Sequence, residues 1–249
     1  MKTLAKAVLP RMAVQTISKL LLKRRKWRKS QANRNRSASD VFSEIYANNL
    51  WGGSEGDFHS GAGTHGPAAP LYLSTINAFI KKNDILSVVD IGCGDYEIGS
   101  KIEVPQYTGV DVVSTLTERN NALFGSVNRS FKCIDAAGAD RLPIADLCLI
   151  RQVMQHLSNK QILAILKKLD SFKYVIVTEH QPSEEDYRSA NRDKAHGDDT
   201  RLYYGSGVYL NQPPFNLRTH LLAEHPGNPA QLDVHERGPI RTFLVDLSH

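Results

Sequence analysis

The sequence predicts an α/β protein with a doubly wound, mostly parallel, seven-stranded sheet and a basic N-terminal arm. Five short apolar runs typical of buried strands follow one another between residues 86 and 177, with segments of helical periodicity before and between them. Strands that alternate with helices in this way form parallel sheets covered by helices on both faces. The 249 residues suffice for one such domain. We expect an arm at 1–39 and one domain at 40–249.

The arm is expected from the distribution of charge. Residues 1–39 hold twelve Lys or Arg residues and no Asp or Glu, whereas the rest of the chain holds nineteen basic and twenty-six acidic residues. The domain is therefore mildly acidic, which argues against a basic groove, and we expect no nucleic-acid partner. Within 1–36, the densest charge, KRRKWRK at 23–29, follows the apolar stretch, the reverse of the order in a secretory signal.

Two interpretations of the arm remain open. It is either a solvated basic tail or an amphipathic segment that lies on an anionic membrane with Trp27 at the headgroups. No apolar run reaches the roughly 20 residues that span a bilayer. Cys93, Cys133 and Cys148 lack the paired spacing of a zinc site and are expected to be reduced. We predict a cytoplasmic protein, with peripheral contact at the inner membrane surface as the second interpretation.

The domain is expected to begin with a helix and a flexible loop. Asp40 is a plausible N-cap for the helical segment VFSEIYANN. The glycine-rich segment Leu50–Gly66 is a loop, which either closes over a ligand as a lid or serves as a plain connector. Apolar residues at helical spacing then predict a helix over Leu71–Ile80.

The regular part of the sheet follows. Predicted strands cover Leu86–Ile91, Tyr107–Val113, Phe131–Ile134, Ala145–Ile150 and Tyr174–Val177. Ser158 and Gln161 form a capping box before a helix that continues to Leu169. The charged segment Ser183–Thr200 is expected to be exposed, and Ala230–Arg237 and Ile240–Leu247 are the candidates for two closing strands.

A glycine turn follows the first predicted strand in VVDIGCG, Val88–Gly94. Gly92 and Gly94 let a ligand approach the backbone at the carboxyl edge of the sheet. A dinucleotide site would place a third glycine where Glu97 stands, and that carboxylate would disfavour a pyrophosphate at the helix start. The turn therefore favours a cofactor without phosphate, such as S-adenosyl-L-methionine (SAM), whose ammonium group Asp90 would hold.

Two further strand ends complete the expected cofactor site. Asp111 ends YTGVD, 21 residues after Asp90, where a carboxylate can accept hydrogen bonds from both ribose hydroxyls. Asp135, after FKCI, would receive the adenine amino group, although an Asp at a strand end is as often a turn former. The segment RQVMQHL, 151–157, follows the fourth strand and faces the reactive end of the cofactor.

The motifs VVDIGCG, YTGVD and ADLCLIRQVMQHLS together resemble those of a class I SAM-dependent methyltransferase over residues 70–180. NNLWGG, RQVMQHLS and QPPFNL also resemble a bacterial subgroup associated with tailoring of small molecules or surface glycans. The resemblance implies a Rossmann-like fold and SAM as cofactor. Its binding residues would be Asp90, Gly92, Cys93, Gly94, Asp111, Val112, Asp135, Arg151 and Gln152. Gln152 stands where the pattern RDVLVHL carries Asp, which puts a catalytic base at that position in doubt.

Methyl transfer to oxygen requires alignment of donor and acceptor and removal of a proton. His156 is the first candidate base, although it could instead pack on the sheet or cap the next helix; Glu179 and His180 are the next candidates. The QPPF motif at 212–215 lacks the amide or acid of an amino-group methyltransferase, and we expect a rigid loop near the substrate entrance. His196, Asp198 and Asp199 lie in the segment expected to be exposed, and we predict no metal site.

The predicted function is methyl transfer from SAM to a small-molecule or saccharide acceptor, at oxygen. Three alternatives remain. An RNA or protein methyltransferase would dock its substrate through the basic arm, and a non-catalytic protein would bind SAM without turnover. An NAD oxidoreductase is the weakest alternative, because the third glycine is missing.

Overall fold

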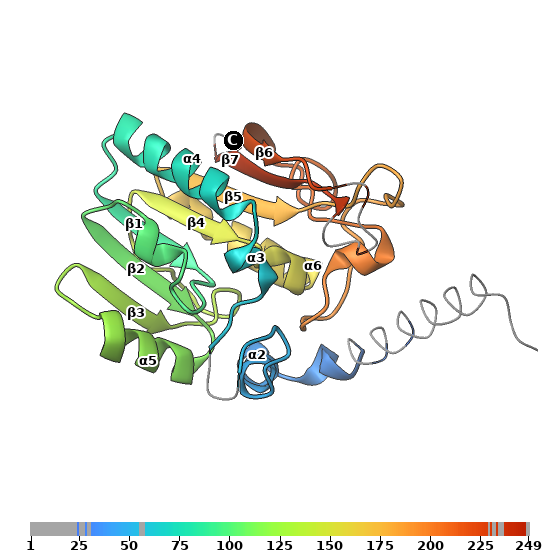
Figure 1. The fold of residues 1–249 in the computed structure, drawn as a ribbon, viewed down its shortest axis with the longest axis horizontal. Coiled ribbons are helices and arrows are strands. Elements are labelled where there is room, and N and C mark those ends of the chain that lie inside the picture. Colours follow the sequence, from blue (N-terminus) through green and yellow to red (C-terminus); the bar gives the residue numbers. More distant parts are fainter. Residues whose placement is uncertain are drawn as a thin grey trace, which may run out of the picture.

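The structure, a computed structural model, describes residues 31–54, 58–228 and 237–247, together with Arg24, Arg28, Ala230 and Asp233. Its centre is a seven-stranded sheet in the order β3-β2-β1-β4-β5-β7-β6 (Figure 1). The first five strands pair in parallel, and β7 is antiparallel to both neighbours. The strands are β1 (Ser87–Ile91), β2 (Gln106–Asp111), β3 (Arg129–Cys133), β4 (Leu147–Arg151), β5 (Tyr174–His180), β6 (Arg218–His225) and β7 (Ile240–Asp246). The predicted seven-stranded, mostly parallel sheet is confirmed.

Helices cover both faces of this sheet (Figure 1). On one face α2 (Ala38–Ala47), α5 (Ser114–Phe124) and α6 (Asn159–Leu166) pack against Val89 and Ile91, and on the other α4 (Ala69–Lys82) packs against Val88. The central strands are buried on both faces, which explains their uninterrupted apolar runs. The remaining helices are α3 (Ala62–His65) and the 3-10 turns η1 (Asn33–Asn35), η2 (Gly99–Lys101), η3 (Met154–His156), η4 (Leu169–Ser171) and η5 (Arg201–Tyr204).

Two helix starts test the capping predictions. The capping box of α6 is confirmed, because the Ser158 hydroxyl accepts from Gln161 N and the Gln161 side chain accepts from Ser158 N. The prediction for α2 was wrong: Ser37 is its N-cap and accepts a 3.0 Å hydrogen bond from Asp40 N. Asp40 lies instead in the first turn, where its negative charge interacts favourably with the positive end of the helix dipole.

The chain ends of the domain depart from the sequence prediction in two ways. The sixth strand is Arg218–His225 and not Ala230–Arg237, most of which lies outside the described residues. Its side chains are largely exposed or half-buried at the sheet edge, so it lacks a clear apolar pattern. The last strand, β7, is confirmed. Residues 1–23, 25–27, 29 and 30 of the predicted arm are not among the described residues, whereas Asn33 and Ala38 are buried against the domain.

Within the described ranges, no helix is both long and apolar enough to cross a membrane.

Candidate functional site

The carboxyl ends of β1, β2, β4 and β5 open onto one cavity of about 890 Å³. Pockets of this size accommodate a cofactor together with part of a substrate. All nine residues predicted to bind the cofactor line this cavity, as do the candidate bases His156 and His180. Glu179 does not line it. The topology therefore gathers at one edge of the sheet residues that lie up to 90 positions apart in the sequence, from Asp90 to His180.

The glycine turn after β1 forms one wall. Gly92 and Gly94 have φ of +72° and +57°, in the left-handed region that favours glycine. A Cβ on Gly92 would overlap the side chain of Val153, and one on Gly94 would overlap Ser60. The turn is held to the next strand, because Val110 O accepts from Gly92 N at 2.7 Å. Glycine is therefore required here both by conformation and by close packing.

Three carboxylates stand along this wall, in different environments. The Asp111 oxygens accept from Gly94 N at 3.2 Å and from Val113 N at 3.1 Å, and burial raises the pKa of Asp111. The Tyr107 hydroxyl donates to Asp90 at 2.7 Å. Burial raises the pKa of Asp90 to about 6, although the Tyr107 bond and the nearby charge of Arg151 oppose the shift. Asp135 is exposed and accepts from Ala137 N.

The loop before α4 packs over the glycine turn. Ser60 N donates to the Asp95 carboxylate at 3.0 Å, and the Ser60 hydroxyl accepts from Asp95 N at 2.7 Å. Farther along, Gly63 O accepts from the Arg151 guanidinium at 2.6 Å, and a Cβ on Gly63 would overlap Gln152. The described part of Leu50–Gly66 thus contacts both the first and the fourth strand ends, which favours a cover over a plain connector.

Beyond β4 the chain turns sharply into η3, which carries His156. Gln152 adopts φ of +56°, uncommon for a residue with a side chain. On the side of β5, the Glu179 carboxylate accepts hydrogen bonds from Met154 N at 2.8 Å and from Gln155 N at 3.2 Å. Glu179 is fully buried, which raises its pKa to about 8. Its place outside the cavity does not fit the predicted role of a base, and its contacts are those of a positioning residue.

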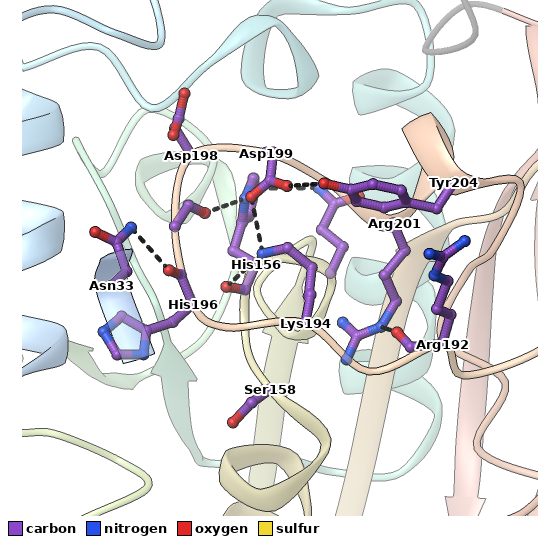
Figure 2. Close-up of polar contacts among 12 residues, drawn as sticks. Asn33, His156, Ser158, Arg192, Lys194, His196, Asp198, Asp199, Arg201 and Tyr204 are labelled. Carbon is purple, nitrogen blue, oxygen red and sulfur yellow. Dashed lines mark hydrogen bonds and ion pairs between the residues drawn. The ribbon is translucent and has the colours of Figure 1, made fainter. Parts of the chain in front are cut away.

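The segment 191–204, here called the clamp, holds η3 from the other side (Figure 2). Lys194 lies between the Asp199 carboxylate, at 3.1 Å, and His156 O, at 3.3 Å. Gly197 N also donates to His156 O, and the Arg201 guanidinium donates to Met154 O at 2.8 Å. The prediction that Ser183–Thr200 is exposed was wrong for this part. Lys194, Asp199 and Arg201 are buried because each one meets an opposite charge, a hydroxyl or a carbonyl, whereas Arg192 and Asp193 are exposed.

These contacts orient the candidate bases. His156 Nδ1 lies 3.1 Å from Gly197 O, and His180 Nε2 lies 3.0 Å from Gly238 O. A carbonyl oxygen can only accept, so these nitrogens carry the protons in the neutral rings. The basic nitrogens are therefore Nε2 of His156 and Nδ1 of His180. The Trp51 ring, 5.2 Å from the His156 ring, also lines the cavity.

Two further predictions concern the segments after β5. The QPPF loop does not line the cavity: Phe215 is buried in the core, and the Asn191 amide donates to the carbonyls of Tyr209 and Pro213. The expected place near the substrate entrance was thus wrong. His196 is buried, contrary to expectation, and its carbonyl accepts from Asn33. Among the described residues no three His, Cys, Asp or Glu side chains are grouped as metal ligands.

Several cavity residues were not found by sequence reasoning. Tyr46, Trp51 and Ser60 come from α2 and the loop after it, and Thr200 and Tyr203 come from the clamp and η5. None of them follows a predicted strand end, which was the signal used for the cofactor residues. The motif NNLWGG, which contains Trp51, and the interpretation of Leu50–Gly66 as a lid were the indications that the segment before the sheet belongs to the site.

No family model matches the sequence, and no curated protein matches it. Solved structures with a similar fold include human N-acetylserotonin methyltransferase in complex with SAM, which is 12% identical, with a TM-score of 0.52 over 86% of this chain and 60% of that one. The N-methyltransferase NodS from Bradyrhizobium japonicum is 11% identical, with a TM-score of 0.49 over 74% and 97%. The plantazolicin methyltransferase BpumL in complex with S-adenosylhomocysteine (SAH) is 15% identical, with a TM-score of 0.48 over 94% and 99%. The chain has the fold of the class I SAM-dependent methyltransferases.

Proposed function

We propose that this protein is a SAM-dependent methyltransferase that methylates an oxygen of a small-molecule or saccharide acceptor. One observation carries the proposal: the glycine turn, the buried Asp111 and the imidazoles of His156 and His180 line a single cavity. Methyl transfer to a hydroxyl requires a site that binds the adenosyl group and, in the same cavity, a group that accepts the hydroxyl proton.

The wall formed by β1 and β2 suits SAM. Gly92 and Gly94 expose backbone where the methionyl part would lie, and Asp90 would hold its ammonium group. A carboxylate has about four lone-pair sites, and Asp111 uses two of them on backbone N–H groups. The remaining sites can accept from the ribose hydroxyls. Asp135 would receive the adenine amino group, and Cys93, Val112, Arg151 and Gln152 supply further lining.

Bound SAM would supply a methyl group on a sulfonium, which is a good leaving group. The residues of this chain then have two tasks. The loop that carries Ser60 and Gly63 excludes water from the cofactor, and η3 presents His156, whose Nε2 takes the proton from the acceptor hydroxyl. His180 is the second candidate for this proton. Glu179 acts on the reaction only through η3, which it holds by two backbone hydrogen bonds.

Calorimetric titration of SAM into wild-type protein, Asp111→Asn and Asp140→Asn tests the proposal. Asp140 is exposed and does not line the cavity, so its variant is the matched control. Loss of one charge-assisted acceptor should weaken binding by roughly tenfold or more in Asp111→Asn and leave Asp140→Asn unchanged. Equal affinities for the two variants, or tighter binding of NAD⁺ than of SAM by the wild type, would contradict the proposed site.

A further inference from the structure

The cavity has a second half, opposite the glycine turn. This acceptor half is formed by η3, the end of β5, the clamp, and the described lining residues between β6 and β7. The polar residues that line it besides Gln155 and His156 are His180, Asp198, Thr200, Tyr203, His225, Asn228 and Asp233. The polar groups of this lining are thus hydroxyl, imidazole, amide and carboxylate groups.

The acceptor half carries no fixed positive charge on its described lining residues. Arg151 is the single Lys or Arg among the described residues that line the cavity, and it lies in the cofactor half near Asp90. Lys194 and Arg201 direct their charges to Asp199 and to backbone carbonyls, outside the lining. Asp198 and Asp233 add carboxylates to this half. An anionic acceptor would find repulsion here and no cation.

Two buried polar atoms in this region have no hydrogen-bond partner in the described structure: Gln155 Oε1 and Thr200 Oγ1. Their residues are 7% and 5% exposed, and both line the cavity. Their segments are joined, because the side chain of Arg201, which follows Thr200, donates to the carbonyl of Met154, which precedes Gln155. A buried polar atom without a partner is unfavourable, so a ligand group that reached both atoms at this corner of the cavity would relieve an unfavourable state.

The chemistry of the two atoms selects the ligand group. An amide oxygen can only accept, whereas a hydroxyl both donates and accepts. A hydroxyl of the acceptor can therefore donate to Gln155 Oε1 and accept from Thr200 Oγ1, whereas a carboxylate or phosphate dianion could not donate. The Gln155 amide nitrogen lies 3.4 Å from His156 Nε2, to which it can donate, so the imidazole stands beside Gln155 in the cavity wall.

We propose that the acceptor is a neutral polyhydroxylated molecule, bound through one hydroxyl by Gln155 and Thr200 and methylated on the adjacent hydroxyl beside His156. This inference rests on the proposed function. In the step, the adjacent oxygen forms a bond to the methyl carbon while the carbon–sulfur bond breaks and its electron pair stays on sulfur. The hydroxyl proton passes to His156 Nε2. The products are a methyl ether, SAH and a protonated imidazole that loses its proton to solvent.

A panel of acceptors tests the class of substrate. Full-length protein with bound SAM is incubated with methyl glucoside, methyl galactoside, methyl rhamnoside and inositol, and in parallel with glucuronate, glucose 6-phosphate and glucosamine, and SAH formation is measured. Transfer to a neutral compound at least tenfold faster than to any charged one is expected. Faster transfer to an anionic or amino compound, or none to any neutral compound although SAM binds, would overturn the inference. Failure to bind SAM would instead overturn the proposed function.

Variants at the corner test the two residues. Thr200→Val keeps the shape and removes the hydroxyl, and Thr200→Ser restores it; Thr219→Val on β6, outside the lining, is the control. Thr200→Val should raise KM for the preferred neutral compound by roughly tenfold, with kcat and SAM affinity changed less than twofold, and Thr200→Ser should recover most of the loss. Gln155→Leu should act in the same direction. An unchanged KM in both Thr200→Val and Gln155→Leu, with SAM still bound, would contradict the assignment.

Discussion

The two halves of the cavity are built in different ways. In the cofactor half, Gly92, Asp111 and Asp135 each lie within two residues of the end of a parallel strand, and backbone hydrogen bonds at these strand ends hold the segments in place. In the acceptor half, η3 is held between Glu179 and the clamp by buried charged side chains that lie 25 to 47 positions away in the sequence. The comparison teaches that residues at the ends of parallel strands can be located from the sequence, whereas the position of η3 depends on tertiary contacts that the sequence does not reveal.

The largest expected effect concerns His156 on η3, which the clamp holds in place. His156→Ala should lower kcat for methyl transfer by roughly 100- to 10,000-fold, the usual contribution of a general base, and leave SAM affinity nearly unchanged. His220→Ala, on the exposed edge strand β6, is the matched control. Transfer is measured with the acceptor identified by the panel of neutral and charged compounds. Full turnover in His156→Ala would exclude the imidazole as base and shift the assignment to His180.

A second prediction asks whether the acceptor half depends on buried charge for its stability. Arg201 is fully buried and donates to Met154 O, Asn159 Oδ1 and Arg192 O. Arg201→Met leaves these acceptors without that donor and removes the buried cation whose charge lowers the pKa of Glu179, so the free energy of unfolding should fall by roughly 3 kcal/mol. Arg218→Met removes the ion pair between the exposed Arg218 and the half-buried Asp246 and should change the free energy of unfolding by less than about 0.5 kcal/mol.

Urea unfolding followed by circular dichroism measures both variants. If Arg201→Met were as stable as Arg218→Met, the clamp would not be held in the way described. A parallel titration of SAM sharpens the comparison, because the cofactor half should retain its affinity under conditions in which Arg201→Met is folded.

The sequence predicted the strand ends of the cofactor half but not the contacts of the clamp. The strand ends with Asp90, Asp111 and Asp135 were predictable, because parallel strands end at one edge and their apolar runs are easy to identify. Lys194 and Asp199 were predicted to be exposed, since charged residues are almost never buried unless they are paired. Their partners lie on η3 or elsewhere in the clamp, and no sequence pattern pairs them. The sixth strand was missed for a related reason, because its edge position leaves it without alternating apolar residues.

The smallest expected effect is a change in pH dependence. Burial raises the pKa of Glu179 from the ordinary 4.5 to about 8, so folding favours the protonated form. The stability from this group is fully present below pH 4.5 and is lost as the pH rises through 8. Urea midpoints of the wild type should therefore fall from pH 5 to pH 9 more steeply than those of Glu179→Gln. Asp90 titrates in both proteins and cancels in the difference. Parallel curves would show that Glu179 is ionised in the folded protein throughout this range.

Hydrogen exchange of the wild-type protein with and without SAH tests most directly whether the cofactor binds in the cofactor half, against the glycine turn and Asp111. Bound SAH should slow exchange of the amides in Gly92–Asp95 and of Val112 and Val113, which surround Asp111, and leave β6 unchanged. Protection confined to the acceptor half, or no change at the glycine turn at saturating SAH, would contradict the assignment of this cavity to SAM.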